Sequence, residues 1–286
     1  MKITDLAITS LETITVFDTN GDYLFTLDEL QNATLNQGQE KVDITGKQGR
    51  KITSLKRNKT VTVSGTNGLV STGLLEMQTG GEFVEGEGLV LWPDEISVSG
   101  SASSTTLNTT YIPVGSEGAE IISLYVKNEN GTLGKEYVQG KMNEEGKALA
   151  EDGFTFAYTT GEGNVVKNGV ITLGAAVEAG TEFVAYYNRK IAKALTLENI
   201  SDSYSKKGKV YIDAMAEDKC ANVYHVQYFI PKADFNGEFE QTLGDDQTVH
   251  AFEIEALAGG CDGVNGFFTL TIIGEGATDA SMTKTA

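Results

Sequence analysis

The sequence has 286 residues, with 40 acidic against 22 basic side chains and a formal net charge of −18 at pH 7. This charge argues against a protein that grips nucleic acid, because phosphate contacts need lysine and arginine. Two cysteines are too few for a disulfide framework, the N-terminus lacks a signal-peptide pattern, and no apolar run reaches the roughly 18 residues of a membrane span. We therefore expect a soluble protein, made in the cytosol, with no membrane partner.

Residues 1–30 predict two alternating strands joined at Asn20-Gly21, a pair that is typical of tight hairpins. The same stretch spaces its oxygen-bearing side chains as a calcium-binding loop does: Asp18, Asn20, Asp22 and Glu29. Tyr23 stands where such a loop needs glycine, and the residues before Asp18 indicate a strand rather than a helix. The hairpin is the favoured interpretation, with calcium as the alternative.

Residues 34–64 look extended and polar, and bases gather within them. Residues 41–59 contain Asp43 as their only acid and the following bases: Lys41, Lys47, Arg50, Lys51, Lys56, Arg57 and Lys59. One basic segment on an acidic chain suggests self-complementarity between copies, and a solvated loop is the alternative. Because residues 45–59 have little to bury, we expect them to be mobile in an isolated subunit until a partner orders them.

Ser71 to Gln78 predicts the best helix of the chain, since Ser71 can cap its start and Gly80-Gly81 can end it. From Phe83 onward, short β-rich runs alternate with glycine, asparagine and serine turns, as in all-β sandwiches and barrels. The predicted fold is all-β, mainly an antiparallel sandwich or barrel-like structure with one short flanking helix. We expect one elaborated domain over 1–286, with 101–190 as a possible inserted or outward β subregion.

Residues 209–258 predict the central antiparallel sheet. Alternation and β-branched or aromatic residues indicate strands at 210–215, 223–230, 235–242 and 249–257, and Pro231 is expected to stop the second of them.

Groups that could carry chemistry are sparse. Two histidines share the second half of the chain with the two cysteines, and these four side chains could in principle bind zinc: Cys220, His225, His250 and Cys261. Their spacing matches no tight zinc motif, and satisfied sheet histidines and free thiols are the favoured interpretation. Nucleotide-binding loops and nucleophile elbows are absent from the sequence. We predict no catalytic residue, no cofactor and no metal.

Two stretches carry a family resemblance. Residues 182–257 contain the strings EFVAYYN and IPKA before a final acidic strand, and residues 42–80 run from VDITGKQGRK to the predicted helix. Both resemble the major tail (tail tube) proteins of long-tailed bacteriophages.

The resemblance implies a structural virion protein without catalysis, made in the host cytoplasm and located in the tail. Subunits of this family form hexameric rings in which the inner sheets close a barrel, and the rings stack into a tube beside other tail proteins. DNA passes through the acidic-lined lumen without specific binding, and residues 41–60 would be the arm between subunits. The alternatives are a capsid-decorating or head–tail joining protein, or a calcium- or carbohydrate-binding β module around 18–29 or Trp92.

Overall fold

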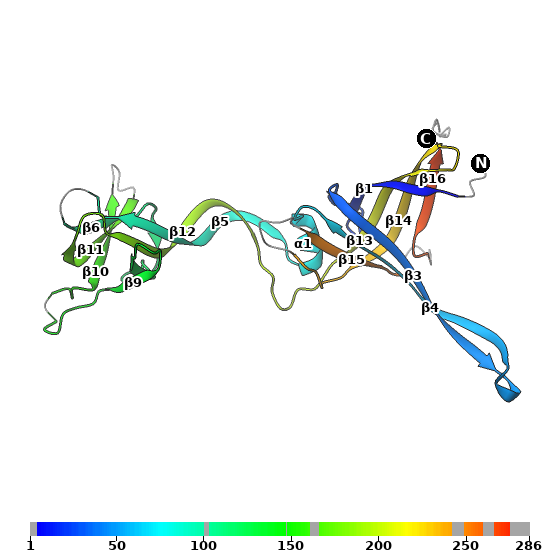
Figure 1. Cartoon of the computed structure of the whole chain (residues 1–286), viewed down its shortest axis with the longest axis horizontal. Helices are drawn as coiled ribbons and strands as arrows, with labels where there is room; N and C mark the ends of the chain where they lie inside the picture. The colour runs from blue at the N-terminus through cyan, green and yellow to red at the C-terminus, as the bar shows by residue number, and fades with distance from the viewer. Residues whose placement is uncertain are drawn as a thin grey trace. The chain divides into compact units, whose positions relative to one another are not determined.

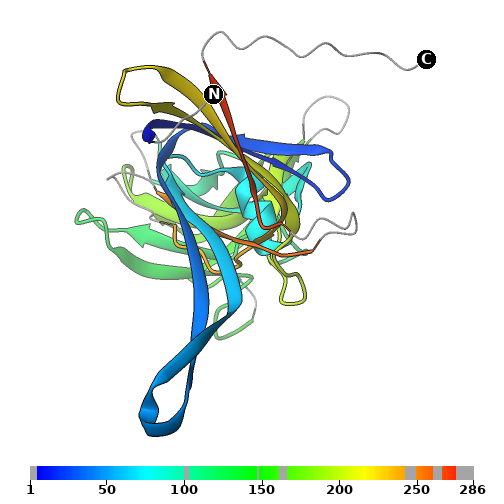
Figure 2. The same cartoon turned by 90° about the vertical axis from the view of Figure 1, so that its right-hand side faces the viewer.

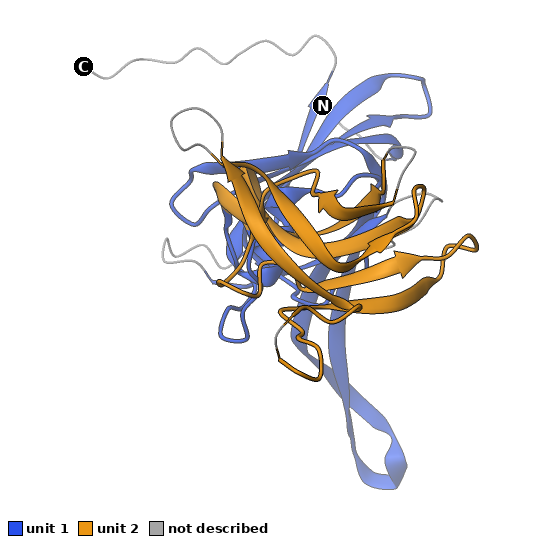
Figure 3. Cartoon of the chain, turned by 90° about the vertical axis from the view of Figure 1, so that its left-hand side faces the viewer, with its two compact units in different colours: residues 1–83, 197–286 blue, residues 84–196 orange. Residues whose placement is uncertain are grey.

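The structure is a computed structural model that describes residues 5–99, 103–146, 148–160, 166–241, 249–259 and 266–274. The chain forms two compact units, residues 1–83 with 197–286 and residues 84–196 (Figures 1 and 3). Both are built from β-strands, and the described residues contain one short α-helix. The predicted all-β fold, mainly antiparallel with one short helix, is confirmed.

The first unit is organised around a single sheet, in the order β2-β1-β13-β14-β15-β4-β3, with β16 also paired to β14. All of these pairs are antiparallel. β14 has two neighbours on one side, because its first half pairs with β16 and its end pairs with β15. The strands are β1 (Ala7–Phe17), β2 (Tyr23–Leu27), β3 (Leu30–Thr45), β4 (Lys51–Asn67), β13 (Lys207–Glu217), β14 (Val223–Phe235), β15 (His250–Ala256) and β16 (Thr269–Gly274).

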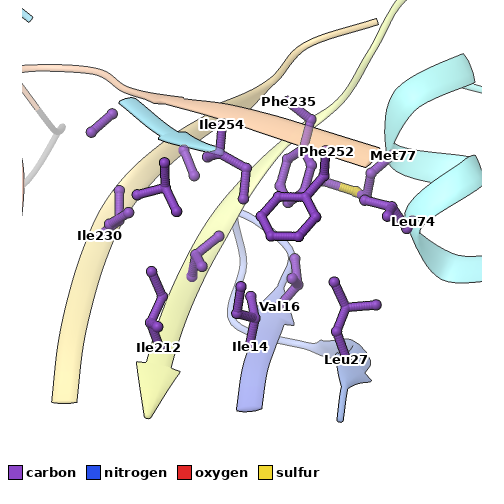
Figure 4. Close-up of a cluster of buried hydrophobic side chains, with 14 of the residues drawn as sticks. Ile14, Val16, Leu27, Leu74, Met77, Ile212, Ile230, Phe235, Phe252 and Ile254 are labelled. Carbon is purple, nitrogen blue, oxygen red and sulfur yellow. The ribbon is translucent and has the colours of Figure 1, made fainter. Parts of the chain in front are cut away.

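This sheet curls around one hydrophobic core (Figure 4). Strict alternation along β13 buries every second side chain, from Val210 to Ala216. Strands from both ends of the sheet contribute to the same cluster, which is possible only because the sheet curls. The cluster includes Ile14, Val16, Leu27, Val63, Ile212, Ile230, Phe235, Phe252 and Ile254. The Asn20-Gly21 hairpin between β1 and β2 is confirmed.

The helix α1 (Thr72–Thr79) covers one end of this core, as predicted. The Ser71 hydroxyl accepts a hydrogen bond from the Leu74 backbone N–H at 3.3 Å, which caps the helix start. Gly80 ends the helix in the left-handed conformation, with φ at 76°. Between these caps, Leu74 and Met77 are buried in the core.

The second unit has its own sheet, in the order β5-β12-β8-β9-β10-β11-β6, with β7 also paired to β12. Its pairs are antiparallel except for a short parallel contact between β9 and β10. A separate cluster that includes Leu124, Phe154, Phe183 and Tyr187 forms its core. The strands are β5 (Phe83–Ser97), β6 (Ser104–Asn108), β7 (Pro113–Val114), β8 (Ser123–Lys127), β9 (Leu133–Gln139), β10 (Gly153–Thr160), β11 (Val166–Val177) and β12 (Glu182–Leu197).

The sequence predicted one elaborated domain over 1–286 with a possible subregion at 101–190, and this stays a prediction; the second compact unit overlaps that subregion. The second unit begins earlier, because β5 pairs with β12 and so joins the sheet of residues 84–196. Whether this region faces outward in an assembly stays a prediction.

The expected strand end at Pro231 is wrong, because β14 continues to Phe235. Between the pairs Gly208–Ala233 and Val210–Ile230, two residues of β14 lie opposite one residue of β13. This β-bulge accommodates proline, which has no N–H for the regular ladder. The expected strand at 235–242 is also absent from 236–241, apart from a bridge between Gln241 and His250; Thr242 lies outside the described residues.

The left-handed cap of α1 gives a stability prediction. A Cβ at Gly80 would lie 2.1 Å from the Tyr204 backbone oxygen, whereas a Cβ at Gly21, also at positive φ, would meet only the tip of Lys209 at 3.8 Å. The variant Gly21→Ala should therefore lower the free energy of unfolding by about 1–2 kcal/mol, from the left-handed backbone strain alone. The variant Gly80→Ala should lower it by roughly a further 1–3 kcal/mol, because the new Cβ would also clash with the Tyr204 backbone. Urea unfolding measures both, and equal losses would contradict the close contact at Gly80.

Candidate assembly interface

The basic segment at 41–60, which we call the arm, is the distal part of the long β3–β4 hairpin. The strands pair from Leu30–Asn67 to Thr45–Lys51, and a short 3₁₀ turn at Lys47–Gly49 closes the tip. Figure 2 shows the arm as a two-stranded ribbon. Most side chains of the arm are exposed. β15 pairs with β4 at residues 61–67, and the arm extends beyond this pairing. Because an isolated two-stranded hairpin is only marginally stable in water, we expect a ribbon of this kind to contact a partner surface.

The arm has two different faces. Directly opposed residues share a face, so the pair Val42–Leu55 and neighbouring Ile44 lie on one side, while Lys41–Lys56 lie on the other. Ile44 is 41 % exposed and Leu55 is 56 % exposed. Exposure of this apolar face to water is unfavourable, and burial under a second surface would be stabilising.

Two groups of ion pairs hold the strands of the arm together. The Lys51 ammonium lies 2.7 Å from the Asp43 carboxylate. Arg57 donates two hydrogen bonds to Glu40, at 3.0 and 3.2 Å. Asp43 also holds the pKa of Lys51 above its ordinary value through their hydrogen bond. These pairs are exposed, so each adds little stability and serves mainly to fix the ribbon.

The remaining bases of the arm face solvent without an acidic partner. Within the described ranges, no ion pair within 4.0 Å involves Lys47, Arg50 or Lys56, while Lys59 lies 5.5 Å from the Phe267 ring centre. Lys47 and Arg50 flank the hairpin tip. The tip therefore presents positive charge that the subunit itself does not neutralise.

A second candidate surface lies on the sheet of the first unit. β1, β13, β14 and β16 form four neighbouring strands, and we call their side away from the core the outer face. Along β13 and β14 this face carries partly exposed polar and aromatic side chains, including Tyr211, Asp213, His225, Gln227 and Phe229. The helix α1 packs on the opposite side of the sheet, where Leu74 and Met77 join the core.

This four-stranded region also has two unpaired edges. β1 pairs with β13 on one side, and only its last four residues, from Ile14, pair with β2 on the other. β16 pairs with β14 on one side and has no described strand on the other. Free N–H and C=O groups along such edges are templates for pairing with another chain. β16 was not predicted from the sequence, although its β-branched run TLTII is a strand signal.

The calcium candidates serve the β1–β2 turn. The Asp18 carboxylate accepts hydrogen bonds from the backbone N–H groups of Gly21 and Asp22, at 2.6 and 2.8 Å, and from the Asn20 amide at 3.0 Å. These bonds, the one from Asp22 first, hold the pKa of Asp18 below its ordinary value. Glu29 contributes its backbone oxygen to Gly68. The carboxylate oxygens of Asp18 are thus already hydrogen-bonded within the turn.

The zinc candidates lie in different surroundings. Cys220 is exposed in the β13–β14 turn, and His225 lies on the outer face with its Nε2 3.1 Å from Asp213. His250 is buried at the start of β15, and Cys261 lies outside the described residues. Among the residues that the structure describes, no three His, Cys, Asp or Glu side chains are grouped to hold a metal.

His250 has a structural role at the start of α1. Its Nδ1 accepts a hydrogen bond from the Ser71 N–H at 3.3 Å, so Nε2 carries the proton and donates to Gln78 Oε1 at 2.8 Å. The Gln78 amide in turn donates to the Ala251 backbone oxygen. Burial lowers the pKa of His250 below its ordinary value of 6.5.

Trp92 is also engaged within its own unit. Its ring packs edge-on against Tyr111, with centroids 5.3 Å apart, and the Arg189 guanidinium lies over both rings. Nearby, buried Asp94 accepts a hydrogen bond from Tyr187 at 2.7 Å. Burial, aided by this bond, raises the pKa of Tyr187. Arg189 thus covers one face of the Trp92 ring.

Comparison with known proteins identifies a family. The chain matches the YomU/Tube protein family over residues 6–269. No curated protein matches the sequence. In the described residues, no helix is both long and apolar enough to cross a membrane.

The buried His250 gives a pH prediction. In the unfolded chain the imidazole takes up a proton near pH 6.5, while the folded first unit resists it. The free energy of unfolding should therefore be constant above about pH 7 and fall as the pH drops through 6.5. Thermal unfolding between pH 5 and 8 measures this.

The variant His250→Gln should flatten that pH dependence of the free energy of unfolding. The matched variant His225→Gln still contains His250 and should show the same pH dependence as the natural sequence. An unchanged slope in His250→Gln would exclude the buried histidine as the cause.

Proposed function

Since the chain belongs to the YomU/Tube protein family, which covers nearly all of its length, we propose that it polymerises as stacked hexameric rings into a phage tail tube. Family membership indicates a structural role in the virion tail. The finer proposal is that the subunit lines a conduit for DNA ejection and contacts copies of itself and other tail proteins. The observation that supports it best is a four-stranded sheet region with two free edges and, over residues 7–17, 211–217, 223–229 and 269–274, no lysine or arginine.

The strand directions allow ring closure. β1, β13, β14 and β16 alternate in direction, so β1 and β16 run in opposite directions. In a ring, β16 of one copy therefore meets β1 of the next copy as an antiparallel pair. Each contact is head-to-tail, and such contacts form a closed ring when the rotation closes. A shared barrel would remove both edges.

Six copies give a barrel of suitable width. With four strands per copy, about 24 strands spaced by about 4.8 Å and tilted by about 40° close a barrel about 48 Å across. Side chains narrow this opening but leave room for a DNA duplex. We place the outer face toward the lumen, since the opposite side of these strands holds the core.

The composition of these strands suits the passage of a polyanion. Residues 7–17, 211–217, 223–229 and 269–274 contain no lysine or arginine, whereas they contain Glu12, Asp213 and Glu217. Without lysine or arginine the wall offers no strong phosphate contact, and its carboxylates repel the backbone. DNA can then slide without adhering. The bases are concentrated instead in the arm, which we assign to contacts between rings.

The arm gives the first assembly prediction. Arg50→Glu with Lys51→Glu should leave the subunit folded by circular dichroism and block polymerisation, because it reverses charge that neighbouring copies would neutralise. Negative-stain electron microscopy of concentrated protein should show tubes or stacked rings for the natural sequence and none for this variant.

Two further variants sharpen this test. Lys47→Glu with Arg50→Glu leaves the Lys51–Asp43 pair intact and should also block polymerisation. Lys135→Glu with Lys167→Glu makes the same charge change outside the arm and should assemble normally. Tubes of normal length from both arm variants would remove the arm from the interface.

The free edge of β16 gives the second assembly prediction. Consecutive residues of an antiparallel strand direct their N–H groups to opposite sides, so of Thr271 and Ile272 one bonds to β14 and the other faces the free edge. Proline at the edge-facing position should preserve the thermal midpoint and prevent rings, whereas proline at the other position should lower the midpoint. Analytical ultracentrifugation measures ring formation. Rings from a thermally unperturbed edge variant would contradict edge pairing through β16.

A further inference from the structure

A second uncovered apolar surface lies on β5. In a strand, alternate residues share a face, so Glu85, Glu87, Leu89 and Leu91 lie on one side; we call these four the β5 strip. Leu89 is 60 % exposed and Leu91 is 54 % exposed. The strip is acidic at its first two positions and apolar at its last two.

The backbone of β5 is also unpaired on one side. β5 is the end strand of its sheet and pairs only with β12 among the described strands. The opposite face of β5 adds exposed Val84 and Val90, and β12 adds exposed Leu195. A long edge strand with this much exposed apolar surface is an interaction site or an aggregation hazard unless a partner covers it.

The arm and the β5 strip are complementary in charge and in apolar character. Val42, Ile44 and Leu55 form the apolar face of the arm, and the basic tip at Lys47 and Arg50 continues from it. The β5 strip likewise has an apolar part that continues into an acidic part. Glu85 makes no ion pair within 4.0 Å in the described ranges, and Glu87 contacts only Lys190, at 2.5 Å.

We propose that the arm of one copy docks on the β5 strip of another copy. The apolar face of the arm covers Leu89 and Leu91, while its tip pairs with Glu85 and Glu87. This inference rests on the proposed assembly into a tube and assigns the surface that receives the arm. It gives residues 84–91 a role in polymerisation that is separate from the pairing of β1 with β16.

Charge reversal with rescue tests the proposal. Glu85→Lys with Glu87→Lys should reduce the number of tubes at least tenfold in negative-stain images, although the protein stays folded by circular dichroism. Combining it with Lys47→Glu and Arg50→Glu in the same chain should restore tubes, because each docked pair then regains opposite charges. Glu117→Lys with Glu129→Lys, an equal charge change at exposed sites elsewhere in the second unit, should leave assembly unchanged.

Cysteine cross-linking tests the contact itself. With Cys220 and Cys261 replaced by serine, a Leu55→Cys protein mixed with a Leu89→Cys protein should form a disulfide-linked heterodimer under tube-forming conditions. A mixture of Leu55→Cys with Ile122→Cys, another exposed apolar position of the second unit, serves as control.

The outcomes separate this inference from the proposed function. If the natural sequence forms no tubes, the proposed function fails. If tubes form, and Glu85→Lys with Glu87→Lys also forms them in normal number, the β5 strip does not receive the arm. Disulfides only between two copies of the Leu89→Cys protein would show that β5 pairs with itself, which also overturns the proposal.

Discussion

The constraint on which this structure depends is that backbone N–H and C=O groups along a sheet need partners. The sheet of the first unit curls over one core, yet β1 and β16 remain edges of its four-stranded region. Unpaired edges of this kind are templates for pairing with another chain. In the proposed ring, the same edges would let identical copies complete one another without any new fold.

In the first unit, the residues that stabilise the fold differ from those that we propose to mediate assembly. Burial of side chains such as Ile14, Ile212 and Ile254, capped by α1, stabilises the subunit without a partner. The arm contributes almost nothing to this core, since its side chains lie in solvent. Changes in the arm or at the edges can therefore alter assembly while the subunit stays folded. The cap at Gly80 and the buried His250, by contrast, make contacts within the subunit that bear on its folding.

The distribution of charge follows the same division. Where all four strands of the outer face overlap, at residues 7–17, 211–217, 223–229 and 269–274, they hold no lysine or arginine, and Lys207, Lys209 and Lys232 lie outside this overlap. The arm holds seven of the 22 bases of the chain. In the proposed tube, a wall without bases would not retain phosphate, and an arm rich in bases would bind acidic surfaces of sibling subunits. Net charge alone could not reveal this arrangement, because it depends on which strands become neighbours.

Much of the fold was predictable because it is encoded locally. The cap at Ser71, the glycine at 80 and the hairpin at Asn20-Gly21 act through residues a few positions apart, so the sequence alone identified α1 and the first hairpin. Alternation likewise identified the strands at 210–215, 223–230 and 249–257, whereas the strand expected at 235–242 is absent from 236–241. The basic segment at 41–59 was also visible, since it needs only a count of charges.

What the sequence determined is therefore the β class, the local turns and caps, and the existence of a basic segment on an acidic chain. The tertiary structure decided which strands lie side by side, because pairing joins residues far apart in the chain. It placed Pro231 in a bulge opposite β13 and made β1 and β16 the free edges. It also folded the basic segment into a ribbon with one apolar face, since the register of β3 and β4 sets which side chains share a side.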